Sequence, residues 1–104
     1  MIKASFYTEN GSFTGFSLSG HAGYAGCGED IVCAAVSSAA MLTANTVTDF
    51  FGEDAAVSAK DNVLSLKLSH RSEASEKLIR SFYSHLDVLS RQYQGTIQLI
   101  CTEV

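Results

Sequence analysis

The sequence predicts an α+β fold in which two helices pack on a mostly antiparallel mixed sheet, with the element order ββαββαβ. Three observations predict it. Apolar residues alternate with polar ones in several short runs, two longer segments carry apolar residues at helical spacing, and glycine, aspartate and asparagine residues separate these segments. The 104 residues contain no linker or convincing repeat, so we expect one domain over residues 1–104, large enough to bury a core without disulfides.

The first two strands are expected to form a hairpin. Apolar and polar residues alternate from Ile2 to Tyr7, which is the period of a half-buried strand. Asn10-Gly11 follows, and this pair favours a two-residue hairpin turn because both residues tolerate positive φ. The return strand is expected from Phe13 to Ser19, with Gly15 marking a bulge.

A long helix is expected from Asp30, with Asp30 as its N-cap and Gly52 as the glycine after its end. Cys33 would then lie in the first turn, where unpaired backbone N–H groups still point outward. The many alanines indicate that the helix packs closely against the sheet on more than one side. The apolar residues at helical spacing are Val32, Val36, Ala39, Ala40, Met41, Val47, Phe50 and Phe51.

A second hairpin is expected from Ala55 to Ser69, with its turn at Asp61-Asn62. A last strand follows Gly95, and in it Cys101 alternates with two apolar residues, which predicts a place in the core.

The second helix is expected from Ser72 to Gln94, capped by Ser72 and ended by Gly95. Acidic residues in its first turn suit the positive end of the helix. Its apolar residues fall three and four apart in an amphipathic stripe: Ile79, Phe82, Leu86, Leu89 and Tyr93.

The charge pattern argues against a nucleic-acid partner. The net charge is −4, and the seven lysines and arginines are scattered singly, so no basic stripe exists to neutralise a run of phosphates.

Membrane and secretory segments are also not expected. The weakly polar run from Ile31 to Leu42 is interrupted by two serines and is too short to cross a bilayer. Polar residues in the first strand break any signal-peptide core, which points to the cytoplasm. Three unevenly spread cysteines argue against a disulfide framework there.

The segment from Gly20 to Cys33 carries the strongest chemical signal. It places His21 at the end of an expected strand and Cys33 at the start of an expected helix, with a glycine-rich loop between them. Cysteine attacks as the thiolate, a helix N-terminus lowers a thiol pKa, and a nearby imidazole completes the activation. The pattern therefore predicts a Cys/His nucleophilic site. The structural alternatives are a buried cysteine and a surface histidine.

Two further residues are candidates for supporting roles. Asp30 is expected to cap the helix, and it could also orient His21 as the third member of a triad. Ser37 lies one turn after Cys33 on the same helical face, where it either bonds back to the helix or contacts the thiolate, His21 or the substrate. The glycine-rich loop is either a lid over a peptide or an ordinary mobile loop. His70 and His85 are weaker candidates.

Zinc is a further alternative, because His21, Cys27 and Cys33 are evenly spaced and a catalytic zinc uses three ligands of these types. The usual short spacing between cysteines is missing and no fourth ligand is evident, so we expect no metal and no cofactor. Cys27 is then an incidental loop thiol.

Gly20-His21, followed by the loop and then Asp30-Ile31-Val32-Cys33-Ala34-Ala35-Val36-Ser37, resembles the ribosomal-processing cysteine protease family, Prp. The resemblance implies a cytosolic endopeptidase that removes a short N-terminal extension from a bacterial large-subunit ribosomal protein, number twenty-seven. It implies a His21–Cys33 dyad, with Gly20, Asp30 and Ser37 at family positions.

The resemblance also implies a homodimer, a loop that reorganises around the substrate, and an apolar groove for apolar and aromatic residues before the cut. Cys27 departs from the family pattern. The alternative from another class is a non-catalytic ribosome-assembly or interaction protein in which Cys33 only packs.

Overall fold

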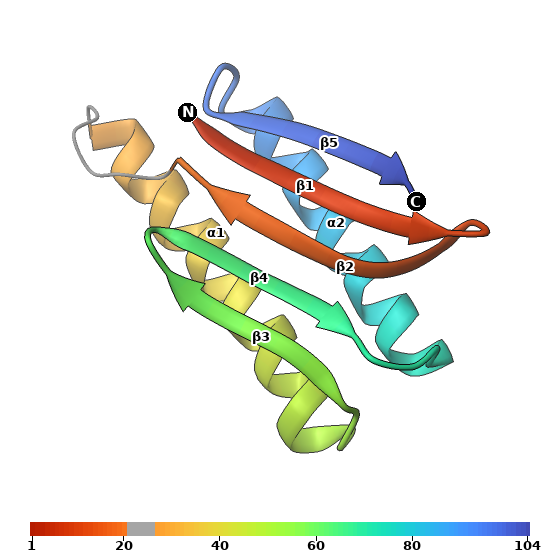
Figure 1. Ribbon diagram of the computed structural model, residues 1–104. Helices are drawn as coiled ribbons and strands as arrows, with labels where there is room; N and C mark the ends of the chain where they lie inside the picture. Colours follow the sequence, from red (N-terminus) through yellow and green to blue (C-terminus); the bar gives the residue numbers. More distant parts are fainter. Residues whose placement is uncertain (21–26) are drawn as a thin grey trace.

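Five strands form one sheet, and two long helices cover one of its faces, in the computed structural model (Figure 1). The structure describes residues 1–20 and 27–104, and of residues 27–30 only the backbone. In chain order the elements are β1 (Ile2–Glu9), β2 (Ser12–Ser19), α1 (Cys27–Asn45), the π-helical turn η1 (Thr46–Phe50), β3 (Ala55–Lys60), β4 (Val63–Leu68), α2 (Glu73–Gln92) and β5 (Ile97–Glu103). The predicted α+β fold and element order are confirmed.

The strand order across the sheet is β3-β4-β2-β1-β5. Every neighbouring pair is antiparallel except β1 and β5, which run parallel. The parallel pair requires a long connection, and α2 supplies it by carrying the chain from β4 to the far edge of the sheet. The sheet is therefore mixed and mostly antiparallel, as predicted.

Both predicted hairpin turns form where the sequence places them. Asn10 and Gly11 have φ values of 53° and 81°, and Asp61 and Asn62 have values of 56° and 61°. Positive φ at both central residues is the requirement of the tight turn that matches the twist of two antiparallel strands.

The predicted bulge in β2 lies next to Gly15. Tyr7 pairs with Gly15 and Thr8 pairs with Phe13, so Thr14 is the extra residue of the bulge. A side chain at Gly15 would collide with the backbone oxygen of Leu66 in β4, which explains the glycine.

The start of α1 differs from the prediction. The helix begins at Cys27, so Asp30 lies inside its first turn and is not the N-cap, and Cys33 lies in the second turn. No proline or β-branched residue between 27 and 30 interrupts a helix, and acidic residues at 29 and 30 suit its positive end.

The helical segment formed by α1 and η1 ends just before Gly52, as predicted, and Gly52 has a φ of 65°. The π-helical turn η1, which widens this end, was not predicted. Within it, the Phe51 backbone N–H donates to the Thr46 carbonyl at 2.9 Å.

One stripe of apolar residues along α1 is buried in the core, but it contains fewer residues than the sequence predicted. Met41, Phe50 and Phe51 belong to it by spacing and are exposed. A second flank of α1 contacts α2, so the helix is covered on two sides. The buried residues of α1 and η1 are Val32, Val36, Ala40, Thr43, Ala44 and Val47.

By length and composition alone, the helical segment Ile31–Phe50 could cross a membrane. It is longer than the run predicted from the sequence, because the helix continues past Leu42 into η1. The length argument from the sequence was therefore wrong. The buried stripe against the sheet shows what this apolar segment covers in the fold.

The second helix begins and packs as predicted. Ser72 is its N-cap and accepts a hydrogen bond from the Ser75 backbone N–H at 3.2 Å. Tyr93 is its C-cap and is exposed rather than part of the stripe, and Gly95 follows with a φ of 83°. The buried apolar residues are Ile79, Phe82, Leu86 and Leu89.

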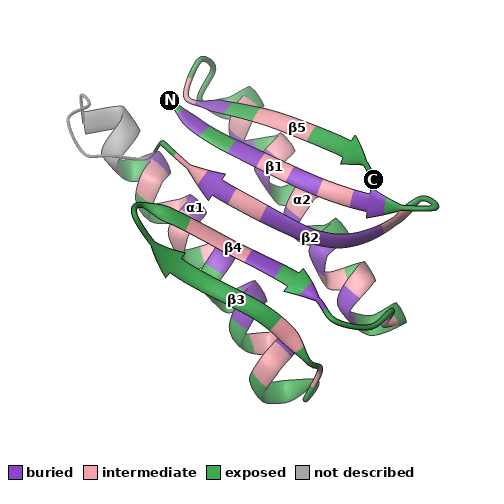
Figure 2. Cartoon of the chain, in the orientation of Figure 1, coloured by how far each residue is buried: buried purple, intermediate pink, exposed green. Residues whose placement is uncertain are grey.

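The centre of the core is Phe6 on β1, whose ring lies 5.1 to 6.1 Å from four other aromatic rings. Figure 2 shows buried residues concentrated on the central strands β1 and β2. The prediction that Cys101 lies in the core was wrong, because it is exposed. It lies near the end of β5, an edge strand of the sheet.

Candidate active site

Cys33 lies in the second turn of α1. It is half-buried and packs against the hydrophobic core. Ser37 and Met41 follow it at intervals of four residues, which keeps them on neighbouring parts of one flank. Both line a groove whose opposite wall is the β3–β4 hairpin. Cys33 itself is not one of the residues that line this groove, and it precedes Ser37 by four residues on α1.

The start of α1 at Cys27 changes the position of Cys33 relative to the helix N-terminus. The first four backbone N–H groups of a helix lack partners within it, and the positive end of the dipole acts within the first turn. Cys33 follows the helix start by six residues. Cys33 therefore lies farther from the positive end of the helix than the sequence predicted.

Gly20 directly follows β2, and both its backbone conformation and its close surroundings require glycine. Its φ is 81°, and a Cβ at this position would lie 2.6 Å from the backbone oxygen of Met1. His21 follows directly. β2 ends beside the start of α1, at one end of the sheet (Figure 1).

Several predicted site groups lie outside the described part of the chain. His21 is one, and the side chains of Cys27 and Asp30 are two more. The dyad, the lid, the orienting role of Asp30 and the zinc alternative therefore stay predictions. Among the residues that the structure describes, no three histidine, cysteine or acidic side chains are grouped as metal ligands are.

The remaining candidates have clear positions. Ser37 is half-buried and lines the groove, whereas its neighbour Ser38 is exposed. His70 lies in the connection before α2 and His85 lies on that helix, and both are exposed.

The β3–β4 side of the groove was not identified from the sequence as part of a site. The groove has a volume of about 530 Å³. The alternation of Val57 and Ala59 with polar residues indicates a strand, but only the tertiary fold places that strand across a groove from Ser37 and Met41. The residues from this side are Val57, Ala59, Lys60, Asp61, Asn62, Val63 and Leu64.

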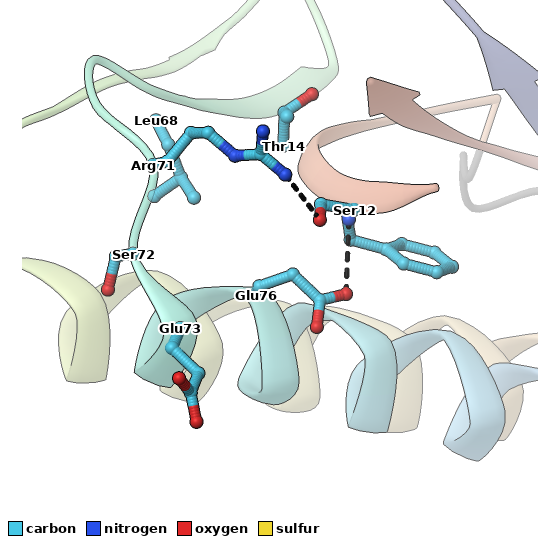
Figure 3. Close-up of a pocket in the computed structure, with 8 residues that line it drawn as sticks. Ser12, Thr14, Leu68, Arg71, Ser72, Glu73 and Glu76 are labelled. Carbon is cyan, nitrogen blue, oxygen red and sulfur yellow. Dashed lines mark hydrogen bonds between the residues drawn. The ribbon is translucent and has the colours of Figure 1, made fainter. Parts of the chain in front are cut away.

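A second hollow, of about 300 Å³, lies between β2 and the start of α2 (Figure 3). In it Arg71 donates a hydrogen bond to Ser12 Oγ at 2.9 Å, and Glu76 accepts one from the Phe13 backbone N–H at 3.1 Å. Glu76 is also paired with Arg80 at 2.8 Å. Among the described residues, the lining of this hollow contains no cysteine or histidine, and these contacts join β2 to α2.

Solved structures share this fold over the whole chain. The protein SMU.848 from Streptococcus mutans is 24% identical, covers 100% of this chain and 99% of its own, and has a TM-score of 0.84. The essential ribosomal processing protease Prp from S. aureus was solved with a substrate peptide and with a covalently linked product peptide. Those structures are 19% and 20% identical, cover 98% of this chain and 100% of their own, and have TM-scores of 0.90 and 0.87.

No curated protein matches this chain at a significant level. The family model described as cysteine protease Prp matches residues 1–98, which is nearly the whole chain. The chain therefore belongs to the cysteine protease Prp family and is a cysteine peptidase.

Proposed function

We propose that this protein is an endopeptidase that removes a short N-terminal extension from a bacterial large-subunit ribosomal protein, number twenty-seven. The observation that carries the proposal is the family match over residues 1–98. A peptide substrate is supported by the S. aureus protease, which was solved with a substrate peptide. Cys33 is half-buried and precedes the groove residue Ser37 by four residues on α1, which supports its role as the nucleophile.

The proposed reaction is acyl transfer. His21 accepts the proton of the Cys33 thiol, and the thiolate attacks the scissile carbonyl carbon. The tetrahedral intermediate collapses to a thioester as the leaving amine takes the proton from His21. Water then hydrolyses the thioester, with His21 as the base, and releases the new carboxylate. Backbone N–H groups near the start of α1 stabilise the oxyanion.

Three residues support the dyad in this proposal. Gly20 allows the backbone to approach Met1 closely just before His21. Asp30 orients His21, and Ser37 donates a hydrogen bond to the thiolate or the substrate. No metal or cofactor takes part.

We further propose that the enzyme is a cytoplasmic homodimer, one domain over residues 1–104, with no membrane or nucleic-acid partner. Three large apolar residues on α1 and η1, Ile31, Leu42 and Phe50, are between 59% and 82% exposed. An exposed apolar face of this kind is typical of a protein interface.

The test is cleavage of the extension peptide, with product masses recorded, by the wild type and by Cys33→Ala and His21→Ala. Removal of the nucleophile should abolish cleavage, and removal of the base should lower kcat/KM by at least about a hundredfold. Cys101→Ser changes an exposed cysteine on β5 and should leave cleavage unchanged.

Two results would contradict the proposal. One is cleavage that survives in Cys33→Ala. The other is a wild type that binds the peptide or its parent protein and does not cut it, which favours the ribosome-assembly alternative.

A further inference from the structure

The turn of the first hairpin contains a pair of residues, Asn10-Gly11, that is able to react with itself. The backbone nitrogen of the residue after an asparagine attacks the side-chain amide carbon, and glycine favours this attack because it has no side chain to obstruct it. Both residues are exposed, so water reaches the turn. No other asparagine of the chain is followed by glycine.

The reaction exchanges ammonia for water. The Gly11 nitrogen loses its proton and forms a bond to the side-chain carbon of Asn10. The side-chain nitrogen leaves with that proton as ammonia, and a cyclic imide remains. Water then opens the ring and leaves either aspartate or isoaspartate, in which the backbone continues through the side-chain carbon. A neutral amide is thereby replaced by a carboxylate.

Two side chains from distant elements hold this turn, which lies beside the end of β5 (Figure 1). Glu103 of β5 accepts hydrogen bonds from the backbone N–H groups of Asn10 at 2.6 Å and Gly11 at 3.4 Å. Thr8 Oγ1 donates to the same carboxylate at 2.6 Å and fixes its position. Arg80 of α2 donates to the Gly11 carbonyl oxygen at 3.2 Å. We call the contacts of Glu103 and Arg80 with the turn the clamp.

The clamp opposes the reaction in two ways. The Gly11 nitrogen attacks only after it loses its proton, and the Glu103 carboxylate beside it repels the negative charge that this loss creates. The nitrogen must also swing toward the side-chain carbon by rotation about the Cα–C bond of Asn10. Glu103 holds the N–H groups on both sides of that bond, so the rotation requires these hydrogen bonds to break.

The second hairpin has a similar turn without a clamp. Asp61 and Asn62 have φ values of 56° and 61°, and both central residues of the first turn also have positive φ. Within the described part of the chain, no side chain of another element forms a hydrogen bond to the Asp61-Asn62 turn. The next residue is Val63, whose branched side chain obstructs attack by its nitrogen. The clamp is therefore found at the turn that carries the reactive pair.

We infer that Asn10 is a deamidation site and that the clamp protects it while β5 stays attached to the first hairpin. When the clamp opens, Asn10 is converted to an acidic residue next to Glu103. The two like charges then repel each other, so the clamp does not re-form as before. Deamidation thus makes the detachment of this end of β5 irreversible. The inference does not depend on the peptidase function.

The test measures the conversion of Asn10 by peptide mapping with mass spectrometry during incubation in mildly alkaline buffer. Glu103→Ala removes the carboxylate of the clamp. Ser72→Ala removes the cap of α2 and is the control for a general loss of stability. Val63→Gly gives the second turn an asparagine–glycine pair without a clamp, so that two such pairs are compared in one folded molecule.

Asn10 should be converted severalfold faster in Glu103→Ala than in the wild type, and at the wild-type rate in Ser72→Ala. In Val63→Gly, Asn62 should be converted severalfold faster than Asn10, because only Asn10 is clamped. In the wild type, unfolding in urea should accelerate the conversion of Asn10, because unfolding opens the clamp.

Four results would overturn the inference. One is a conversion rate in Glu103→Ala that equals or falls below that of the wild type. Another is an equal acceleration in Ser72→Ala, which would show that general stability sets the rate. The third is an Asn62 in Val63→Gly that is converted no faster than Asn10, and this comparison decides the matter alone if Glu103→Ala does not fold. The last is an Asn10 that stays unconverted in urea.

Discussion

Glu103, near the end of β5, holds the turn of the first hairpin. Its carboxylate accepts hydrogen bonds from Thr8 Oγ1 at 2.6 Å and from the backbone N–H groups of Asn10 at 2.6 Å and Gly11 at 3.4 Å. These bonds, led by the one from Thr8, hold the pKa of Glu103 below its usual value of 4.5.

The lowered pKa predicts a pH-dependent stability. A carboxyl group whose pKa is lower in the folded state stabilises the fold above its unfolded pKa, and this contribution is lost as the pH falls through the folded value. Glu103→Gln should therefore be less stable than the wild type at pH 7, with a difference that shrinks below pH 4.5. Urea unfolding at several pH values measures it. A difference that stays constant with pH would contradict the role of the charge.

Gly20 is predicted to be intolerant of any side chain. Gly20→Ala should cost more than the ~1–2 kcal/mol of left-handed backbone strain, because its Cβ also meets the Met1 carbonyl. Gly52→Ala is the matched control, since Gly52 has a φ of 65° and nothing within 4 Å of an added Cβ. Urea denaturation should rank Gly20→Ala below Gly52→Ala. Equal losses would show that the contact with Met1 is unimportant.

At the scale of single residues, spacing within one helix could be predicted and tertiary burial could not. The sequence correctly placed Ser37 one turn from Cys33, because helical geometry is local. It wrongly placed Cys101 in the core, because the alternating pattern of a strand does not reveal that the strand lies at an edge.

At the scale of elements, the hairpins and α2 follow from strong local signals. The Asn10-Gly11 and Asp61-Asn62 pairs supply the positive φ values that their turns require, and Ser72 caps α2. The start of α1 was missed because Asp30 has the chemistry of a cap. The same acidic residue also suits the first turn of a helix that begins earlier.

The cap of α2 gives a prediction for an element. Ser72 Oγ accepts from the Ser75 backbone N–H and donates to Glu53 Oε1 at 2.5 Å, which joins the helix start to the segment after α1. Ser72→Ala should lower the free energy of unfolding by about 1 kcal/mol, the usual cost of a lost cap. The exposed Ser69 serves as the control, and Ser69→Ala should change stability little. Equal effects in urea denaturation would contradict the capping role.

At the scale of the whole molecule, the order of the strands determines the candidate site. The β3–β4 hairpin pairs with β2, which brings Ala59 beside a helix that begins some thirty residues earlier in the chain. Local patterns do not specify which strands become neighbours, so the sequence indicated the nucleophile and left the opposite wall of the groove unassigned.

The proposed dimer gives a prediction for the assembly. Sedimentation of the wild type should give a molecular mass twice the 11.1 kDa of one chain. Leu42→Asp on the exposed face of α1 should produce monomers, because a charge is costly to bury in an apolar interface. Val88→Asp changes an exposed apolar residue of α2 and should leave the dimer intact. A monomeric wild type would contradict the proposal.

The central claim is that Cys33, activated by His21, is the nucleophile that attacks the substrate peptide. The most direct measurement uses the part of the extension peptide before the cut, with a chloromethyl ketone at its carboxyl end. A thiolate displaces the chloride and forms a stable thioether, whose position is mapped by mass spectrometry after digestion. We predict one adduct, on Cys33, formed much more slowly in His21→Ala. An adduct on Cys27 or Cys101, or equal rates in His21→Ala, would contradict the account.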